Sequence, residues 1–360
     1  MKIYFYINIL SNGGAERVIA NLASQFAKDG QEVAVITSFK TQGEYVTADS
    51  VCRYELEETD RTKDNLLKKN IRRIYRLREI LKRDKPDVLV SFMAEPNFRA
   101  ILATVGLKTK NIISVRNDPN VEYKGKIGYI IGKLLLPSAD GCVFQTEEAR
   151  KWFPIKLQNK STVILNPVKE EFYETKWEPI LGRIITCGRL EKQKNHKMLI
   201  DAFLLTNDRI ANLELWIYGK GSLQSELEEY IKQKNANDRV YLQGNVSNVS
   251  KVIGKANVFI LSSDYEGMPN ALMEAMAVGI PCIVTDCPCG GPRMLIKDGE
   301  DGILIPVKST QDLANELYKV LVNNKYAEKL ANNAKIRALE FKPNLVFNNW
   351  KNYIEYIIND

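Results

Sequence analysis

Two glutamates set eight residues apart, Glu266 and Glu274, are the acidic side chains of this sequence whose setting suggests chemistry. An apolar run typical of a buried strand, 258–261, ends shortly before Glu266, and a helical pattern covers 271–277. The first four N–H groups of a helix lack intrahelical partners, so a loop that leads into a helix can hold a phosphate. Carboxylates accept hydrogen bonds from hydroxyl groups, so the pair could hold a sugar. The alternative is that Glu266 caps the helix and Glu274 lies on a solvated face. The loop residues expected at the phosphate are Gly267, Met268, Pro269 and Asn270.

Two cations, Arg189 and Lys194, follow a strand predicted over 183–187. In open α/β sheets, ligands bind beyond the carboxyl ends of the strands. The planar guanidinium and the compact ammonium would neutralise a diphosphate that gains negative charge as it leaves. We therefore count both, with Glu266, as catalytic candidates. The alternative is a pair of surface cations.

Gly13 and Gly14 follow the first predicted strand, 3–9, and open a predicted helix. A βα turn of this kind can receive a phosphate or a sugar, although two glycines alone are also typical of a simple turn. Arg116 and Asn117 end a strand predicted over 111–115.

We expect Arg17, Arg116 and Asn117 to orient a sugar or an acceptor. His196, the only histidine, begins a helix. We favour a packing or capping role for it over acid–base catalysis.

These residues need a scaffold, and the rest of the chain predicts one with two domains. Apolar β-prone runs alternate with amphipathic segments in both halves, which predicts parallel, doubly wound sheets. The pattern breaks at Asn166-Pro167 and then restarts. We expect one Rossmann-like domain over 1–170, a second over 171–340, and a last helix over 341–360 that crosses back to the first domain. A resemblance of their motifs to a known family implies that the first binds an acceptor and the second a nucleotide sugar. The chemistry is expected in the cleft between the domains. The predicted strands are 3–9, 32–38, 87–92, 111–115, 141–145, 162–165, 183–187, 214–218, 240–242, 258–261 and 281–285, and one long helix is predicted over 310–339.

Three motifs resemble those of the retaining family 4 glycosyltransferases of GT-B fold, and their order along the chain is that of the family. The segment 262–277 is similar to the Glu-x7-Glu signature of that family, 188–195 to its phosphate clamp, and 12–17, which reads Asn-Gly-Gly-Ala-Glu-Arg, to its glycine-rich loop. The resemblance implies that Glu266 contacts the transferred sugar and Glu274 the ribose hydroxyls. It also implies that the donor base lies near Asn245. Many relatives carry a histidine where this chain has Arg116-Asn117.

The motif Asp-x-Asp is absent from the chain, so no obvious carboxylate pair could hold a divalent metal against the diphosphate. We expect metal-independent transfer without a cofactor. The donor is a substrate, which the resemblance implies is a UDP-sugar, with UDP-N-acetylgalactosamine favoured. Six scattered cysteines, with no secretory signal or membrane-spanning run, predict free thiols and a cytoplasmic protein.

The positive charge of the chain is concentrated in one stretch. Residues 61–85 hold eleven Lys or Arg and three Asp or Glu, a net of +8, whereas the whole chain has a net charge of +7. An apolar stripe of Leu67, Ile71, Ile74 and Leu81 predicts an amphipathic helix over 66–85. Its cations could attract anionic lipids and the diphosphate of an acceptor. The alternative is a solvated face on a packed helix. The candidate contacts are Lys68, Lys69, Arg72, Arg73 and Arg76.

A second segment, 123–136, combines lysines with aromatic and aliphatic residues and could enter a membrane interface. Both segments are similar to those of N-acetylgalactosaminyltransferases that extend polyprenyl-diphosphate-linked glycans. We therefore expect a peripheral protein on the inner face of the cell membrane. Nucleic-acid binding is disfavoured because no aromatic platform accompanies the basic face. A sugar-nucleotide epimerase and an inactive membrane-binding protein remain as alternatives.

Overall fold

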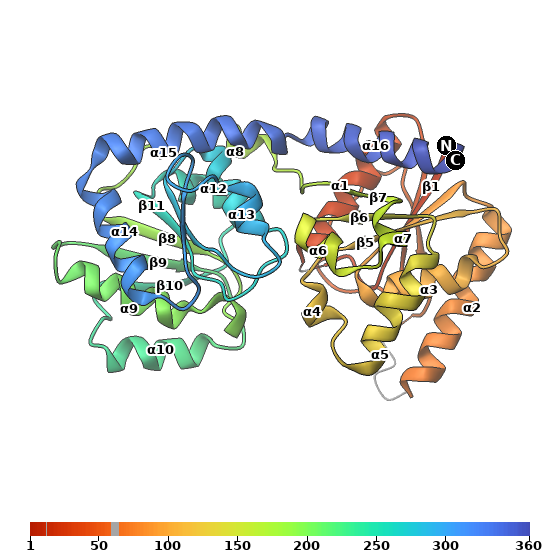
Figure 1. Cartoon of the computed structure of the whole chain (residues 1–360), viewed down its shortest axis with the longest axis horizontal. Coiled ribbons are helices and arrows are strands. Elements are labelled where there is room, and N and C mark those ends of the chain that lie inside the picture. The colour runs from red at the N-terminus through yellow and green to blue at the C-terminus, as the bar shows by residue number, and fades with distance from the viewer. Residues whose placement is uncertain (12, 59–64) are drawn as a thin grey trace. The chain divides into compact units, whose positions relative to one another are not determined.

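The computed structural model describes residues 1–11, 13–58 and 65–360. Its described residues form two compact units, each with its own parallel sheet (Figure 1). Unit 1 comprises 1–166 and 344–360, and unit 2 comprises 167–343. Asn12 and the stretch 59–64, which includes Arg61 and Lys63 of the predicted basic patch, lie outside the described residues. Among the described helices, none is long and apolar enough to span a bilayer.

Unit 1 is built on a seven-stranded sheet with the order β3-β2-β1-β4-β5-β6-β7, and every neighbouring pair is parallel. Alternate residues of β1 pack on opposite faces of this sheet. Ile3 and Phe5 join a core with α1 and α16, whereas Tyr4 and Tyr6 join a core with α2. This burial on both faces explains the apolar runs that predicted the strands. The strands are β1 (Lys2–Ile7), β2 (Glu32–Thr37), β3 (Cys52–Glu55), β4 (Val88–Phe92), β5 (Lys110–Val115), β6 (Gly141–Phe144) and β7 (Ser161–Val163).

The helices of unit 1 include the last one of the chain. α16 buries Trp350, which stacks on Phe92 with ring centroids 5.6 Å apart. This packing places 344–360 in unit 1. The helical segments are α1 (Gly14–Lys28), α2 (Leu66–Asp84), α3 (Ala94–Thr104), α4 (Pro119–Glu122), α5 (Gly125–Ile130), η1 (Ile131–Leu135), η2 (Leu136–Ser138), α6 (Glu147–Trp152), α7 (Ile155–Gln158) and α16 (Pro343–Asn359).

Unit 2 is built on a six-stranded parallel sheet with the order β10-β9-β8-β11-β12-β13. Its strands are β8 (Arg183–Cys187), β9 (Glu214–Tyr218), β10 (Val240–Gly244), β11 (Val258–Leu261), β12 (Cys282–Thr285) and β13 (Ile303–Ile305). Its helical segments are α8 (Glu170–Glu174), η3 (Lys192–Lys194), α9 (His196–Asn207), α10 (Gln224–Gln233), α11 (Val249–Gly254), α12 (Asn270–Val278), α13 (Gly291–Leu295), α14 (Thr310–Val322), α15 (Asn324–Arg337) and η4 (Ala338–Phe341).

Three elements differ from the sequence-based predictions. β3 was not predicted, because this edge strand reads Cys-Arg-Tyr-Glu and none of its residues is fully buried. β13 was too short to stand out. The prediction of a single helix over 310–339 is wrong, because α14 ends before Asn323 and α15 begins after it. The Asn323 side chain caps α15 by accepting from the Tyr326 N–H at 3.1 Å.

Candidate active site

The candidate site of unit 2 lies where three neighbouring strands, β8, β11 and β12, end. β8 has β9 on one side and β11 on the other, so the connections leave it in opposite directions. Such a switch point leaves a crevice at the carboxyl ends of the strands, where ligands of doubly wound proteins bind. Arg189 follows β8 and Glu266 follows β11, so both lie at the switch point, after the strands predicted from the sequence.

The Lys194 ammonium and the Glu266 carboxylate form an ion pair, although 72 residues separate them in the sequence. The side chains are 14% and 8% exposed. Ser263 donates a second hydrogen bond to the Glu266 carboxylate at 2.7 Å. A buried carboxylate needs this compensation, because its transfer from water is costly.

The loop that carries Glu266 is fastened to the turn that carries Lys194. The Asn195 amide donates to the Asp264 carboxylate at 2.9 Å, and the Asp264 N–H donates to the Gln193 carbonyl at 2.8 Å. The Ser262 hydroxyl donates to the Lys194 carbonyl at 2.8 Å. These bonds hold the ammonium and the carboxylate in register before any ligand binds.

Two further glycines allow close approach of backbone at this edge. A Cβ on Gly291 would lie 1.8 Å from the Gly267 carbonyl oxygen, and one on Gly219 would lie 1.9 Å from the Gly188 carbonyl oxygen. Either contact would displace a loop that carries a candidate residue. Gly291 belongs to the loop 287–293, for which the sequence predicts a structural role. Gly219 was missed, although it directly follows β9 and could have been noticed there.

Glu274 lies inside α12 and is 7% exposed. Burial, and to a smaller extent the Glu274 carboxylate, raise the pKa of the Cys187 thiol. The Glu274 carboxylate is therefore near the thiol of Cys187, the last residue of β8. The alternatives considered from the sequence are wrong, because Glu274 is not on a solvated face and Pro269 rather than Glu266 is the N-cap of α12.

The other donor candidates of unit 2 lie in the loop before α12, at the start of α12 and after β10. Gly267, Met268 and Pro269 are buried in the loop, and Asn270 is the first residue of α12. Asn245 is exposed after β10, two strands away from β8.

Arg189 is exposed after β8, and the Lys194 stem passes 3.2 Å from the position of a Cβ on Gly188. The Lys194 side chain therefore folds back over the backbone next to Arg189.

His196 is buried, and its Nε2 lies 3.3 Å from the Arg189 carbonyl oxygen. Burial lowers the pKa of His196 to about 4. The cap of α9 is the neighbouring Asn195, whose side chain accepts from the Met198 N–H. His196 thus belongs to the packing of the loop.

In unit 1 the glycine-rich turn begins α1, with Gly13 at the N-cap and Gly14 exposed. A Cβ on Gly13 would lie 1.9 Å from a Glu16 carboxylate oxygen, so Glu16 folds over the turn. The Arg17 N–H donates to the Gly13 carbonyl at 3.2 Å.

Arg116 is buried against Phe92, with the guanidinium carbon 4.6 Å from the ring centroid, and it donates to the side-chain amide oxygen of Asn166. Burial lowers its pKa to about 9. The Asn117 side chain accepts from the Asp118 N–H at 2.9 Å. Of these two, Asn117 is the more accessible to a ligand.

Met93, which the sequence analysis missed, directly follows β4 and is the N-cap of α3, with φ +79° and ψ 159°. A non-glycine residue rarely adopts this conformation, and such strain is concentrated at functional positions. β4 neighbours β1 at the switch point of this sheet. The backbone of Met93 therefore marks the carboxyl edge of unit 1, and only the folded chain reveals it.

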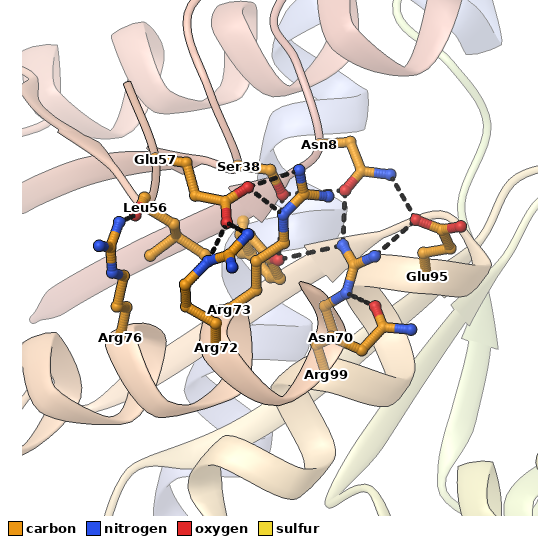
Figure 2. Close-up of polar contacts among 11 residues, drawn as sticks. Asn8, Ser38, Leu56, Glu57, Asn70, Arg72, Arg73, Arg76, Glu95 and Arg99 are labelled. Atoms are coloured by element: carbon orange, nitrogen blue, oxygen red, sulfur yellow. Dashed lines mark hydrogen bonds and ion pairs between the residues drawn. The ribbon is translucent and has the colours of Figure 1, made fainter. Parts of the chain in front are cut away.

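The basic helix α2 differs most from expectation (Figure 2). Arg72 and Arg73 both pair with Glu57, at 2.5 and 2.7 Å, and Arg76 donates to the Leu56 carbonyl. Arg73 is 2% exposed, so its predicted place on the surface is wrong.

The predicted apolar stripe of α2 is also wrong in part, because Leu67 and Ile71 are exposed. The face that α2 buries carries Arg73, Leu77 and Leu81. Lys68 is exposed and Lys69 partly buried.

Comparisons with known proteins agree with this geometry. A model described as glycosyl transferases group 1 matches residues 171–337, and one described as glycosyltransferase family 4 matches 12–172. The chain is 30% identical over 364 residues to a Campylobacter jejuni enzyme named GalNAc-α-(1→4)-GalNAc-α-(1→3)-diNAcBac-PP-undecaprenol α-1,4-N-acetyl-D-galactosaminyltransferase, with 100% of this chain and 99% of the relative covered.

A second Campylobacter jejuni relative is 28% identical over 357 residues, with 94% and 95% covered. It is named N-acetylgalactosamine-N,N'-diacetylbacillosaminyl-diphospho-undecaprenol 4-α-N-acetylgalactosaminyltransferase. Among solved structures, sucrose-phosphate synthase from Thermosynechococcus elongatus matches with a TM-score of 0.86 at 16% identity, over 99% of both chains. The predicted fold class, two parallel-sheet Rossmann-like domains of the GT-B type, is thereby confirmed.

Proposed function

The chain belongs to the glycosyltransferases of group 1 and family 4, and from that membership we propose that it moves a hexose or N-acetylhexosamine from a nucleotide sugar to a lipid-linked glycan with retention of configuration. The observation that carries the proposal is the Lys194–Glu266 ion pair beyond the ends of β8 and β11, together with the buried Glu274 in α12, the helix that follows β11. It combines a cation for phosphate with two buried carboxylates for hydroxyl groups.

In the proposed reaction, the bond between the sugar C1 and the diphosphate oxygen breaks as a bond from C1 to an acceptor oxygen forms on the same face. Arg189 and Lys194 stabilise the diphosphate as it gains charge. Glu266 accepts hydrogen bonds from the hydroxyls of the transferred sugar. The acceptor proton passes to an oxygen of the departing phosphate. The two cations supply the charge that a metal ion provides elsewhere, so we propose metal-independent transfer.

A UDP-sugar is the proposed donor, and UDP-N-acetylgalactosamine is the first to test, because both Campylobacter jejuni relatives are named as N-acetylgalactosaminyltransferases. The names of these relatives also support a polyprenyl-diphosphate-linked acceptor. We place the reaction at the inner face of the cell membrane. All six cysteines are free thiols, which suits a reducing compartment.

A donor screen tests the proposal. Purified protein is incubated with liposomes carrying lipid-linked acceptors, in EDTA, with UDP-, GDP- and ADP-sugars in turn. We expect one donor to release nucleotide and to increase the acceptor mass by whole sugar residues. The anomeric configuration of the product, read by NMR, checks retention.

Three outcomes would contradict parts of this proposal. A changed nucleotide sugar without release of nucleotide would indicate an epimerase. Membrane binding without turnover of any donor would indicate an inactive protein. Turnover that EDTA abolishes and Mg²⁺ or Mn²⁺ restores would contradict metal independence.

A further inference from the structure

Gln193 contacts consecutive residues of the loop that carries Glu266 in unit 2. It belongs to η3, the short turn that also carries Lys194. Its side-chain amide donates to the Tyr265 carbonyl at 2.7 Å and to Glu266 Oε2 at 3.4 Å. Its own backbone carbonyl accepts from the Asp264 N–H at 2.8 Å. The side chain and the backbone of this one residue therefore both fasten the loop that presents Glu266.

The turn that carries Gln193 is itself fixed by local bonds. The Lys194 N–H donates to the Glu191 carbonyl at 2.9 Å, and the Asn195 N–H donates to the Lys192 carbonyl at 3.2 Å. Asn195 ends the turn with φ +46° and ψ 48°, a left-handed conformation that asparagine tolerates better than most residues. The Gln193 amide is thus held in place by a closed turn and needs no ligand to order it.

The two oxygens of the Glu266 carboxylate are engaged to different degrees. Oε1 receives the Lys194 ammonium and the Ser263 hydroxyl. Among the described residues, Oε2 accepts only from the Gln193 amide, and this bond of 3.4 Å is longer than the usual value of about 3 Å. Each carboxylate oxygen has two lone pairs. Oε2 therefore keeps the capacity to accept from a hydroxyl group.

An amide suits this position because it donates a hydrogen bond without adding charge. A second cation at Oε2 would bind the carboxylate strongly and compete with a hydroxyl for it. A carboxylate in place of the amide would repel Glu266. The Gln193 amide can therefore orient Glu266 and still leave Oε2 open to a substrate.

We propose that Gln193 is a positioning residue in the transfer reaction, and that its amide holds the Glu266 carboxylate so that Oε2, rather than Oε1, accepts the hydroxyl of the transferred sugar. The inference rests on the proposed function and deepens it, because it names the oxygen of Glu266 that contacts the sugar and the residue that holds it.

The first test removes the amide. Gln193→Leu should lower kcat about 10–100-fold, the loss that corresponds to one hydrogen bond to a charged group. Binding of UDP, measured by calorimetry, should be unchanged, because UDP carries no sugar for Glu266 to contact. The control Gln158→Leu removes an amide bond of the same length, 2.7 Å to the Phe153 carbonyl in unit 1, and should transfer sugar like the unaltered protein.

Deoxy donors separate positioning from a general structural role. Each donor lacks one hydroxyl of the transferred sugar. With the donor that lacks the hydroxyl bound by Glu266, the unaltered protein should be slow, and Gln193→Leu should slow it little further, because the contact is already lost. With the other donors the full effect of Gln193→Leu should remain. An equal effect with every donor would overturn the assignment, because Gln193 would then only maintain the loop.

Gln193→Glu gives a second test, because the introduced carboxyl has nearly the shape of the amide. When it is ionised it repels Glu266, and when it is protonated it donates an O–H as the amide donates an N–H. The rate of this variant relative to the unaltered protein should therefore rise about tenfold as the pH is lowered from about 8.5 to about 5.5. A ratio that does not change with pH would contradict the role.

The comparison at each pH accounts for the other ionisable groups around Glu266, which include Lys194, Asp264, Cys287 and His196. Burial and, to a smaller extent, the Glu266 carboxylate raise the pKa of Cys287 to about 12, whereas burial lowers the pKa of His196 to about 4. Both values lie outside the tested range. Lys194 and Asp264 are present in the variant and in the unaltered protein alike, so the ratio of the two rates reports on the introduced carboxyl.

The rate of the unaltered protein separates this inference from the proposed function. If the unaltered protein transfers no sugar, the proposed function fails and this inference fails with it. If transfer proceeds and Gln193→Leu matches the unaltered rate, only the inference fails. A loss of UDP binding in a folded Gln193→Leu protein would also overturn it, because the residue would then act on the nucleotide. If circular dichroism shows that Gln193→Leu is unfolded, the pH dependence of Gln193→Glu decides.

Discussion

Two charged clusters occupy the same kind of position in the two units. In unit 1, Arg72, Arg73 and Glu57 form a cluster that extends to Arg99 beyond the ends of β1, β2 and β3 (Figure 2). In unit 2, Lys194 and Glu266 meet beyond the ends of β8 and β11. Both clusters lie at the carboxyl edge of a parallel sheet.

The clusters differ in how fully their cations are engaged. Arg99 is 1% exposed and donates to Asn8, Asn70 and Glu95 at 2.6 to 2.8 Å. In unit 2, Arg189, which follows β8, is exposed.

The density of basic residues along a sequence therefore does not separate structural from functional cations. Exposure separates the buried Arg73 and Arg99 from Arg189. Lys194 is 14% exposed and paired with Glu266, so it is a candidate through its position after β8.

The largest expected effect is the loss of stability on removing Arg73 from the cluster of Arg72, Arg73 and Glu57. Arg73→Ala should lower the free energy of unfolding by about 3–5 kcal/mol, because it removes one of two cations from a buried carboxylate. Urea denaturation followed by circular dichroism measures the change. Lys68→Ala, on the exposed side of the same helix, should change it by about 0.5 kcal/mol or less. Equal, small losses in both variants would mean that the cluster does not stabilise unit 1.

The next effect tests the ion pair of unit 2. Lys194→Ala should lower kcat/KM by about 10²–10³-fold, the usual loss when one group that stabilises developing charge is removed. Glu274→Ala should abolish most of the transfer as well, while circular dichroism shows that the fold is retained. Lys192→Ala is the control, because Lys192 is exposed in the same turn. Wild-type rates in the Lys194 and Glu274 variants would remove the site assignment.

The smallest effect depends on pH and involves His196. Its folded pKa of about 4 lies below the ordinary value of 6.5. The unfolded chain therefore binds the proton first, and stability is complete above pH 6.5 and falls as the pH drops toward 4. The loss should reach at most about 3 kcal/mol.

Denaturation at several pH values measures this loss, with His196→Asn as the control that removes the only imidazole. NMR titration of the single histidine gives its pKa directly. A His196 pKa near 6.5 in the folded protein would contradict the packing role. Unit 2 would then lose no stability through His196 as the pH falls.

Much of the fold followed from local pattern. The buried strands of both sheets gave apolar runs because helices cover both faces, and their parallel order followed from the alternation with helices. The edge strand β3 was not predicted, because a half-exposed strand lacks such an apolar run. The break at Asn323 escaped because a capping side chain inside a continuous helical pattern gives little signal.

The features of the candidate site also divide into those that the sequence predicts and those that only the structure reveals. The sequence by itself determined which residues follow the strands, and so it brought Glu266, Glu274, Arg189 and Lys194 into consideration. Local spacing carries that information because each strand and its following loop are contiguous.

Only the tertiary structure decided that Lys194 pairs with Glu266, that Arg73 is buried and that Met93 is strained. Each depends on contacts between segments far apart in the chain, such as the 72 residues between Lys194 and Glu266. Burial and partnership are properties of the packed core, and no helical or strand period encodes which distant side chain will meet another.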